Sequence, residues 1–326
     1  MKVAILYTGA LRTIKKTIRY FKSNLLNQVP VPDYEISIFA CIQNDTVINN
    51  DNLQTWLVSE LGERLKSIEW FNQKSEIFTM LTNDYLLRDL RIPEHFNNYL
   101  KNSGSIIEHF QMQKAYMKLV THERAHGLKY DYIVRLRTDT IFGKPIDFHW
   151  LHWTKEQVSL RVERIRHVLN DLKIESSSEN ILKYFMQTIL CDDLIENIKN
   201  LNGKFIQHKE MKIPTMDEEI YDYLKNGRFI LTFRKNLLYI VRRELFYLIP
   251  TLGTFYGYQD CHFLEPDWFW NSESQFQATC YNSFLNIHDY TTEFDERSLY
   301  EFDESRYFDE HYNLINKYMV YCLVRY

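Results

Sequence analysis

The sequence predicts an α/β fold, a mixed sheet flanked by helices. Compact apolar runs rich in β-branched residues, typical of buried strands, occur at residues 3–7, 36–41 and 130–142. Segments with helical spacing of apolar residues separate these runs. Polar residues follow each run, and ligands of α/β proteins bind beyond the carboxyl ends of strands. We therefore expect the functional groups at strand ends.

Composition places the chain among ordinary globular proteins. Its 326 residues are 45% hydrophobic, enough for one large domain or two small ones. A net charge of −4 disfavours nucleic acid as a partner. Five widely spaced cysteines without a CxxC pattern predict reduced thiols rather than disulfides or a zinc site. No secretory signal or membrane anchor is evident, so we expect a cytoplasmic protein without a transmembrane segment.

The first strand, Val3–Tyr7, leads through Thr8, Gly9 and Ala10, a predicted tight loop, into a basic helical stretch that begins near Arg12. A phosphate near Gly9 would meet backbone N–H groups, the helix N-terminus and Arg12. The alternative is that the basic residues form a solvated helix face, which we favour for Lys15, Lys16 and Arg19.

The second strand, Ile36–Cys41, also ends in polar residues, and a helix over residues 53–65 separates it from a third strand at Lys66–Phe71. This alternation predicts βαβ units and a nucleotide-binding half. Asn44 or Asp45 would contact a base or ribose there. The alternative, which ranks first, is that both residues form a turn.

A helix is predicted over residues 106–125, with Gly127 as its C-terminal stop. Three histidines lie on or near it: His109, His122 and His126. Because no acidic partner completes a metal-binding spacing such as HExxH, we expect surface histidines.

The strand at residues 130–142 ends in Arg135, Arg137 and Asp139. Their spacing of two places them on one side of an extended backbone. Burying them is costly unless they are paired or bind something charged, and phosphate with a divalent metal would satisfy all three. The alternative is a structural Arg–Asp pair.

Residues 154–202 read as a helical insertion of two helices, with Ser176 and Glu179 as a capping box between them. The insertion either covers an acceptor site or packs on the domain.

Strands follow at 229–233 and 237–241, and then a helix capped by Asn271 or Ser272, with Glu273 in its first turn. A carboxylate there favours the helix dipole. With Trp268, Phe269 and Trp270 before it, Glu273 would also line a sugar-binding cleft.

The tail, residues 291–326, carries a loose acidic and aromatic repeat. Residues 291–311 contain eight acidic residues and two arginines. We expect this segment to lie on the surface and pack on the domain through its aromatic residues, and docking of a basic partner is the alternative.

The chain resembles the nucleotide-sugar-dependent glycosyltransferases of the GT-A fold, including members from bacteria and large DNA viruses. The resemblance is distributed over residues 3–13, residues 110–113, the strand at 130–142 and residues 271–276. It implies a single GT-A-like catalytic domain over residues 1–326, with a Rossmann-type mixed sheet.

In that family the strand ending at Asp139 holds a DxD motif, whose carboxylates bind Mn²⁺ or Mg²⁺ on the donor diphosphate. Here Arg137-Thr138-Asp139 lacks the first aspartate, so only Asp139 is carried over. His288 would complete the metal site or contact the diphosphate, and the alternative is a structural histidine. Hard oxygen ligands suit either metal ion.

Glu273 occupies, by this resemblance, the position of the general base of an inverting enzyme. Asp260, Glu265 and Asp267 are rivals for that role. The predicted activity is transfer of a hexose or pentose from a nucleotide diphosphate sugar, in the first place a UDP-sugar, to a hydroxyl of a glycan, glycoprotein or lipid. A nucleotidyltransferase of similar fold and a non-catalytic sugar- or protein-binding module are the alternatives.

Overall fold

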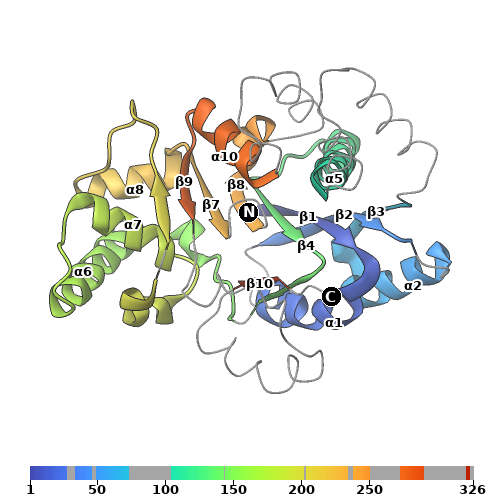
Figure 1. The fold of residues 1–326 in the computed structure, drawn as a ribbon, viewed down its shortest axis with the longest axis horizontal. Helices are drawn as coiled ribbons and strands as arrows, with labels where there is room; N and C mark the ends of the chain where they lie inside the picture. Colours follow the sequence, from blue (N-terminus) through green and yellow to red (C-terminus); the bar gives the residue numbers. More distant parts are fainter. Residues whose placement is uncertain are drawn as a thin grey trace, which may run out of the picture. The chain divides into compact units, whose positions relative to one another are not determined.

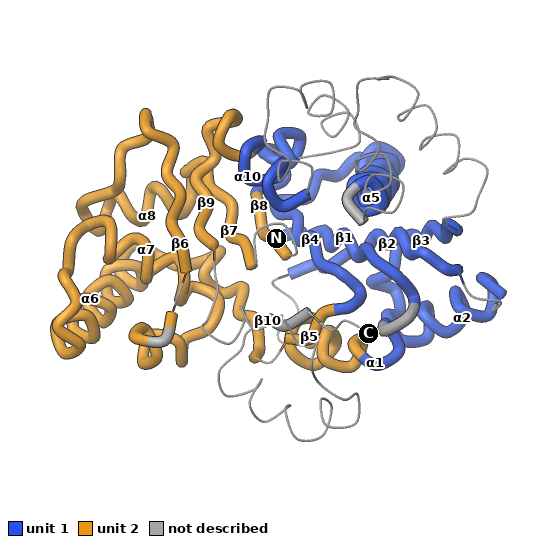
Figure 2. Tube along the Cα trace, viewed as in Figure 1, with its two compact units in different colours: residues 1–16, 33–139, 242–279 blue, residues 17–32, 140–241, 280–326 orange. Residues whose placement is uncertain are grey.

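The computed structural model describes residues 1–27, 34–45, 49–72, 104–142, 144–201, 203–233, 238–249, 272–289 and 321–323 (Figure 1). The chain divides into two compact units (Figure 2). Unit 1 comprises residues 1–16, 33–139 and 242–279, and unit 2 comprises residues 17–32, 140–241 and 280–326. Within the described residues, no helix is both long and apolar enough to cross a membrane.

Unit 1 is built on parallel strands in the order β3-β2-β1-β4. Their bounds are Lys2–Ala10 for β1, Glu35–Gln43 for β2, Leu65–Phe71 for β3 and Tyr132–Arg137 for β4. The middle of β1 is buried, as expected for a parallel strand covered on both faces. This order is that of a Rossmann-type half, in which the chain crosses from one side of β1 to the other.

Helices flank this sheet. They are α2 (Asn50–Leu61), which continues into the 3₁₀ turn η2 (Gly62–Arg64), and α5 (Gly104–His126), on opposite faces in Figure 1. Helix α5 packs on β1 and β2. It ends where predicted, because Gly127 takes a left-handed φ of 59°. Helix α1 (Leu11–Phe21) follows β1 directly, η5 (Arg243–Leu248) is a 3₁₀ helix, and α10 spans Ser272–Asn282.

Unit 2 pairs its strands in the order β8-β7-β9-β6. They are β6 (Lys204–Ile206), β7 (Phe229–Phe233), β8 (Leu238–Arg242) and β9 (Asn286–Asp289). Strand β7 is parallel to β9 and antiparallel to β8, and β6 is antiparallel to β9. A separate antiparallel pair joins β5 (Thr140–Phe142) to β10 (Tyr321–Leu323). The pairing in unit 2 is therefore mixed.

The helices of unit 2 include α6 (Lys155–Asp171), α7 (Ser178–Thr188) and α8 (Asp217–Asn226). Shorter helical turns are η1 (Lys22–Leu26), η3 (His149–His152) and η4 (Asp192–Asn200). The predicted apolar stripe of α6 is buried: Val158, Val162, Ile165 and Leu169. The predicted α/β class, with strands flanked by helices, is confirmed.

Several local predictions differ from the structure. Strand β1 runs through the predicted loop to Ala10, because it pairs with both neighbouring strands. The predicted strand at 130–142 is two strands, with a turn at Thr138 and Asp139 between them.

Two predictions for the helical insertion were also wrong. Helix α7 is capped by Ser177, whose side chain accepts from the backbone N–H of Asn180, rather than by Ser176. The capping box lies instead at Thr154 and Gln157, at the start of α6. The second predicted helix ends at Thr188, and the 3₁₀ helix η4 follows it.

Candidate active site

The carboxyl ends of β1 and β4 meet in a tightly closed arrangement at Gly9. This residue has a φ of 144°, and a Cβ placed on it would lie 2.2 Å from Oγ1 of Thr138. The backbone N–H of Thr138 donates to the carbonyl of Thr8 over 2.9 Å, and its hydroxyl donates to the carbonyl of Ala10 over 2.8 Å. Only glycine fits this position, because a side chain would be strained and would clash with Thr138.

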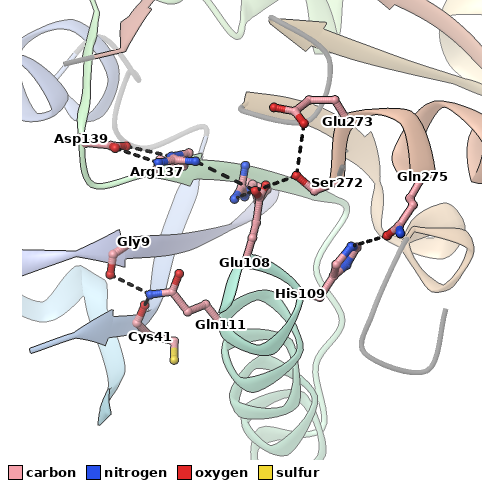
Figure 3. Close-up of polar contacts among 11 residues, drawn as sticks. Gly9, Cys41, Glu108, His109, Gln111, Arg137, Asp139, Ser272, Glu273 and Gln275 are labelled. Atoms are coloured by element: carbon pink, nitrogen blue, oxygen red, sulfur yellow. Dashed lines mark hydrogen bonds and ion pairs between the residues drawn. The ribbon is translucent and has the colours of Figure 1, made fainter. Parts of the chain in front are cut away.

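Gln111, on α5, joins the ends of β1 and β2. Its Nε2 donates to the carbonyl of Gly9 over 2.7 Å and to that of Cys41 over 3.3 Å (Figure 3). Strand β1 lies between β2 and β4, so this edge is the topological switch point of unit 1. Switch points are where α/β proteins bind nucleotides and other ligands.

Two arginines and two carboxylates are paired at the same edge. Arg135 NH2 lies 2.8 Å from Glu108 Oε1. The Nε and NH2 groups of Arg137 donate to the two oxygens of Asp139, each over 2.8 Å, and NH1 lies 3.9 Å from Glu108 Oε2. The turn after β4 allows this bidentate contact, because it brings Asp139 back toward the preceding arginine.

The start of α10 adds a third carboxylate. The Ser272 hydroxyl lies 3.1 Å from Glu108 Oε2 and 3.5 Å from Glu273 Oε2 (Figure 3). Glu273 is partly exposed, whereas Ser272 is buried. We call Glu108, Arg135, Arg137, Asp139, Ser272 and Glu273 the arginine–carboxylate cluster. With its carboxylates ionised, the cluster carries three negative and two positive charges.

Of the two interpretations of Asp139 that the sequence left open, the structure shows the Arg–Asp pair, and binding of a phosphate or a metal there stays a prediction. The pair lies at the switch point and is linked through Glu108 to Ser272. The side chains of Arg135 and Asp139 are 2% and 3% exposed, whereas that of Arg137 is 21% exposed. Of the two arginines of the cluster, Arg137 is therefore the more exposed.

Sequence reasoning missed Glu108. It belongs to the face of α5 that also carries Met112, Ala115 and Leu119, which are all buried. A carboxylate on the apolar face of an amphipathic helix needs a buried partner. The arginines of the following strand supply it, and that combination is the signal which the sequence contained.

His109 corrects the prediction of surface histidines. It is 2% exposed, and its Nε2 lies 3.2 Å from Oε1 of Gln275, which is also buried. Helix α5 therefore contacts α10 through two successive residues, Glu108 and His109. His126, by contrast, is exposed as predicted.

The remaining predicted donor contacts have different surroundings. Asn44 is buried: its Nδ2 donates to Oδ1 of Asn50 over 2.7 Å, and its backbone N–H donates to the carbonyl of Phe71 over 2.8 Å. These contacts link Asn44 to the end of β3 and the start of α2. Thr8 is fully buried at the switch point. The side chain of Arg12 lies outside the described residues, as do Asp260, Glu265, Asp267 and residues 291–320.

His288 belongs to the core of unit 2. Its Nε2 lies 2.9 Å from the hydroxyl of Tyr223, and its ring stacks on Phe205 with centroids 4.4 Å apart. Asn286 donates to the same hydroxyl over 3.1 Å. Burial lowers the pKa of His288 to about 3. These contacts are those of a neutral core histidine and do not support its predicted metal role.

The described residues do not fit a resident divalent ion. None of their His, Cys, Asp and Glu side chains form a group of three or more placed to hold a metal ion. Both oxygens of Asp139 accept from Arg137, so a guanidinium stands where a metal would be bound. Mg²⁺ requires about six oxygen ligands in near-octahedral geometry. One carboxylate that is already paired with arginine does not supply the oxygen ligands of such a site.

The predicted reduced cysteines agree with the structure as far as it describes them. Cys41, Cys191 and Cys280 are free and buried, and burial raises the pKa of each thiol. A buried thiol with a raised pKa is a poor nucleophile. We therefore assign these cysteines to the core.

No protein-family model matches the chain, and no curated protein matches it. Among solved structures, it is similar to mouse xyloside xylosyltransferase 1 in its apo form, with a TM-score of 0.32 and 9% sequence identity. The match covers 100% of this chain and 98% of that one. A likeness at this level leaves the activity open.

Proposed function

We propose that this protein is a glycosyltransferase that moves a sugar from a nucleotide diphosphate sugar to a hydroxyl acceptor. The observation that carries the proposal is the arginine–carboxylate cluster at the switch point of a Rossmann-type half. This edge is the usual nucleotide site of such sheets. The resemblance of the segments around Gly9, Asp139 and Glu273 to GT-A glycosyltransferases supports the same activity.

The chemistry assigns different roles to the two ends of the cluster. As the acceptor oxygen attacks the anomeric carbon, the bond from that carbon to the diphosphate breaks. Arg137 stabilises the charge that develops on the departing diphosphate through N–H donors already held in place. Glu273 takes the proton of the acceptor hydroxyl, as a partly exposed carboxylate can when it is within hydrogen-bonding reach.

The donor is proposed to be a UDP-sugar in the first place, and the acceptor a glycan, glycoprotein or lipid. A nucleotidyltransferase is the second candidate, because it also grips phosphates at the ends of parallel strands. A non-catalytic sugar-binding module is the candidate from a different class, and the closed Arg137–Asp139 pair favours it, since a stable pair needs no ligand.

The test is titration calorimetry of the full chain with UDP-, GDP- and CMP-sugars and with nucleoside triphosphates, followed by chromatography of the nucleotides after incubation. A glycosyltransferase binds at least one nucleotide sugar and releases free nucleotide from it. Preference for a nucleoside triphosphate over every nucleotide sugar would favour the nucleotidyltransferase. Absence of nucleotide binding at millimolar concentration would sink both enzyme proposals.

A further inference from the structure

The bond between Arg137 and Asp139 determines which groups of the site meet an anion. Two parallel N–H···O contacts of 2.8 Å bind both oxygens of Asp139. That carboxylate is 3% exposed, so water does not offer a replacement partner. Charge-assisted bidentate bonds of this kind are among the strongest in proteins. Asp139 is therefore committed to orienting the guanidinium.

The two members of this pair differ in exposure. The side chain of Arg137 is 21% exposed, whereas that of Asp139 is 3% exposed. The guanidinium also lies 3.9 Å from Oε2 of Glu108, an ion-pair distance that is longer than a hydrogen bond. A phosphate oxygen that approaches from solvent therefore meets the arginine before the aspartate. Arg137 is thus the member of the pair suited to phosphate.

A metal ion at Asp139 would require a rearrangement with a large cost. The carboxylate would have to exchange Arg137 for the ion, and the guanidinium would lose its bidentate partner. Removing one partner of an ion pair leaves an uncompensated charge, and at the buried Asp139 such a charge is destabilising. The guanidinium fork also matches phosphate geometry and always carries its charge.

We propose that Arg137, held by Asp139, takes the place of a divalent metal at the donor site, so that the nucleoside diphosphate group binds without a metal ion. This inference rests on the proposed function and names how its site holds the diphosphate. Asp139 is then a positioning residue, and Arg137 is the residue that contacts the ligand.

The experiment measures the Kd of UDP for the full chain by titration calorimetry, once with excess EDTA and once with 5 mM Mn²⁺, a concentration of about the usual order for weak metal sites. The expected Kd values agree within about threefold, which is less than the factor of 10 that 1.4 kcal/mol represents. Metal-dependent binding by more than about tenfold would overturn the proposal and leave the proposed function standing. Lack of UDP binding in both conditions would overturn this proposal, and the proposed function fails with it only if no other nucleotide sugar binds.

The variant that tests the roles is R137Q/D139N, which removes both charges together and keeps side chains that can hydrogen-bond. It avoids the buried unpaired charge of either single variant. We expect at least about tenfold weaker UDP binding in EDTA, the size of one lost charge-assisted hydrogen bond. R137K, which keeps the charge but loses the fork, should recover part of the affinity.

The matched control is E123Q/R243Q. Glu123 and Arg243 form a second buried bidentate pair among the described residues of unit 1, with contacts of 2.9 and 2.7 Å, and neither belongs to the cluster. This variant should bind UDP as the natural chain does. Equal weakening in both double variants, or unchanged affinity in R137Q/D139N with a correctly folded chain by circular dichroism, would contradict the assignment.

Discussion

The described residues of unit 1 contain two buried arginine–carboxylate arrangements, and helix α5 supplies a glutamate to each. Glu123, near the end of α5, pairs with Arg243 and also accepts from the backbone N–H of Tyr130. Glu108 lies in the second turn of the helix and joins the arginine–carboxylate cluster. The two glutamates are separated by about 22 Å of helix, at 1.5 Å per residue. One helix thus serves both ends of β4.

The two arrangements differ in solvent exposure and in the balance of their charges. Glu123 and Arg243 are 7% and 12% exposed, and their charges balance one to one. In the cluster three carboxylates face two guanidiniums, and Arg137 is 21% exposed. A closed pair has no need of a ligand, whereas a branched and partly exposed cluster has donors to offer one. Burial of charge alone does not distinguish a structural pair from a binding site, but charge balance and exposure do.

The largest expected effect is a difference in stability between variants of Glu123 and Glu108. E123Q leaves Arg243 without a carboxylate and should lower the free energy of unfolding by about 3 kcal/mol, the lower end of the cost of breaking a buried pair. E108Q takes the carboxylate from Arg135, which is 2% exposed, but leaves two carboxylates for the two arginines of the cluster, so the loss should be smaller, about 2 kcal/mol. Urea unfolding of both variants measures the difference. Equal losses would show that the two arrangements are energetically alike.

The second prediction concerns turnover. E273Q should lower the rate of sugar transfer by about 10²-fold or more, the size expected for a lost general base, without weakening donor binding. E63Q is the control, because Glu63 is an exposed residue of η2 in the same unit. Initial rates with a UDP-sugar measure the effect. A rate within twofold of the natural chain, roughly 0.4 kcal/mol, would move the base to another carboxylate.

A third prediction concerns the pH dependence of the free energy of unfolding. It uses His288 of unit 2, which lies outside both arginine–carboxylate arrangements. The folded chain holds His288 neutral with a pKa near 3, whereas the unfolded chain titrates near the ordinary 6.5. Between these values the unfolded state binds the extra proton, so stability falls as the pH drops below 6.5. From pH 6.5 to pH 5 the loss is about 2 kcal/mol.

Urea midpoints at pH 7 and pH 5 measure this loss. H288Q cannot titrate and should lose less stability over this range than the natural chain. H167Q should behave like the natural chain, because the His167 side chain is 79% exposed. The same pH dependence in H288Q and the natural chain would assign the acid sensitivity to other groups.

The smallest expected effect tests how tightly the switch point is closed. G9A should cost about 2 kcal/mol, because alanine is strained at this φ and its Cβ meets Thr138. G62A is a control for the backbone alone: Gly62 has a φ of 60°, and a Cβ there meets nothing within 4 Å. It should cost about 1 kcal/mol. Thermal unfolding of both variants gives the comparison, and equal shifts would mean that the contact with Thr138 is easily relieved.

The sequence predicted what local patterns determine. The runs at Val3–Tyr7 and Ile36–Cys41 became strands because apolar alternation and β-branched residues are local signals, and the stop at Gly127 follows from one residue's backbone preference. The turn at Thr138 and Asp139 was not predicted, because Ile141 and Phe142 resume the apolar pattern directly after it in β5.

The pairings inside the site depend on segments far apart in the chain. Glu108 contacts Arg135 and Ser272, which come from different elements, so its position on an apolar helix face indicated a buried partner but not which one. His109 was misjudged for the same reason, because its contact is with Gln275. Residue type indicates what chemistry a side chain can do, whereas only tertiary structure indicates which partners it meets.

Helix α5 also has a mechanical consequence. Between residues 108 and 111 it contacts β4, α10, β1 and β2 through Glu108, His109 and Gln111. A helix is stiff along its hydrogen-bonded axis, so a small tilt of α5 moves these contacts in concert rather than one at a time. Binding of a ligand at Arg137 would therefore shift Gly9 and the start of α10 together.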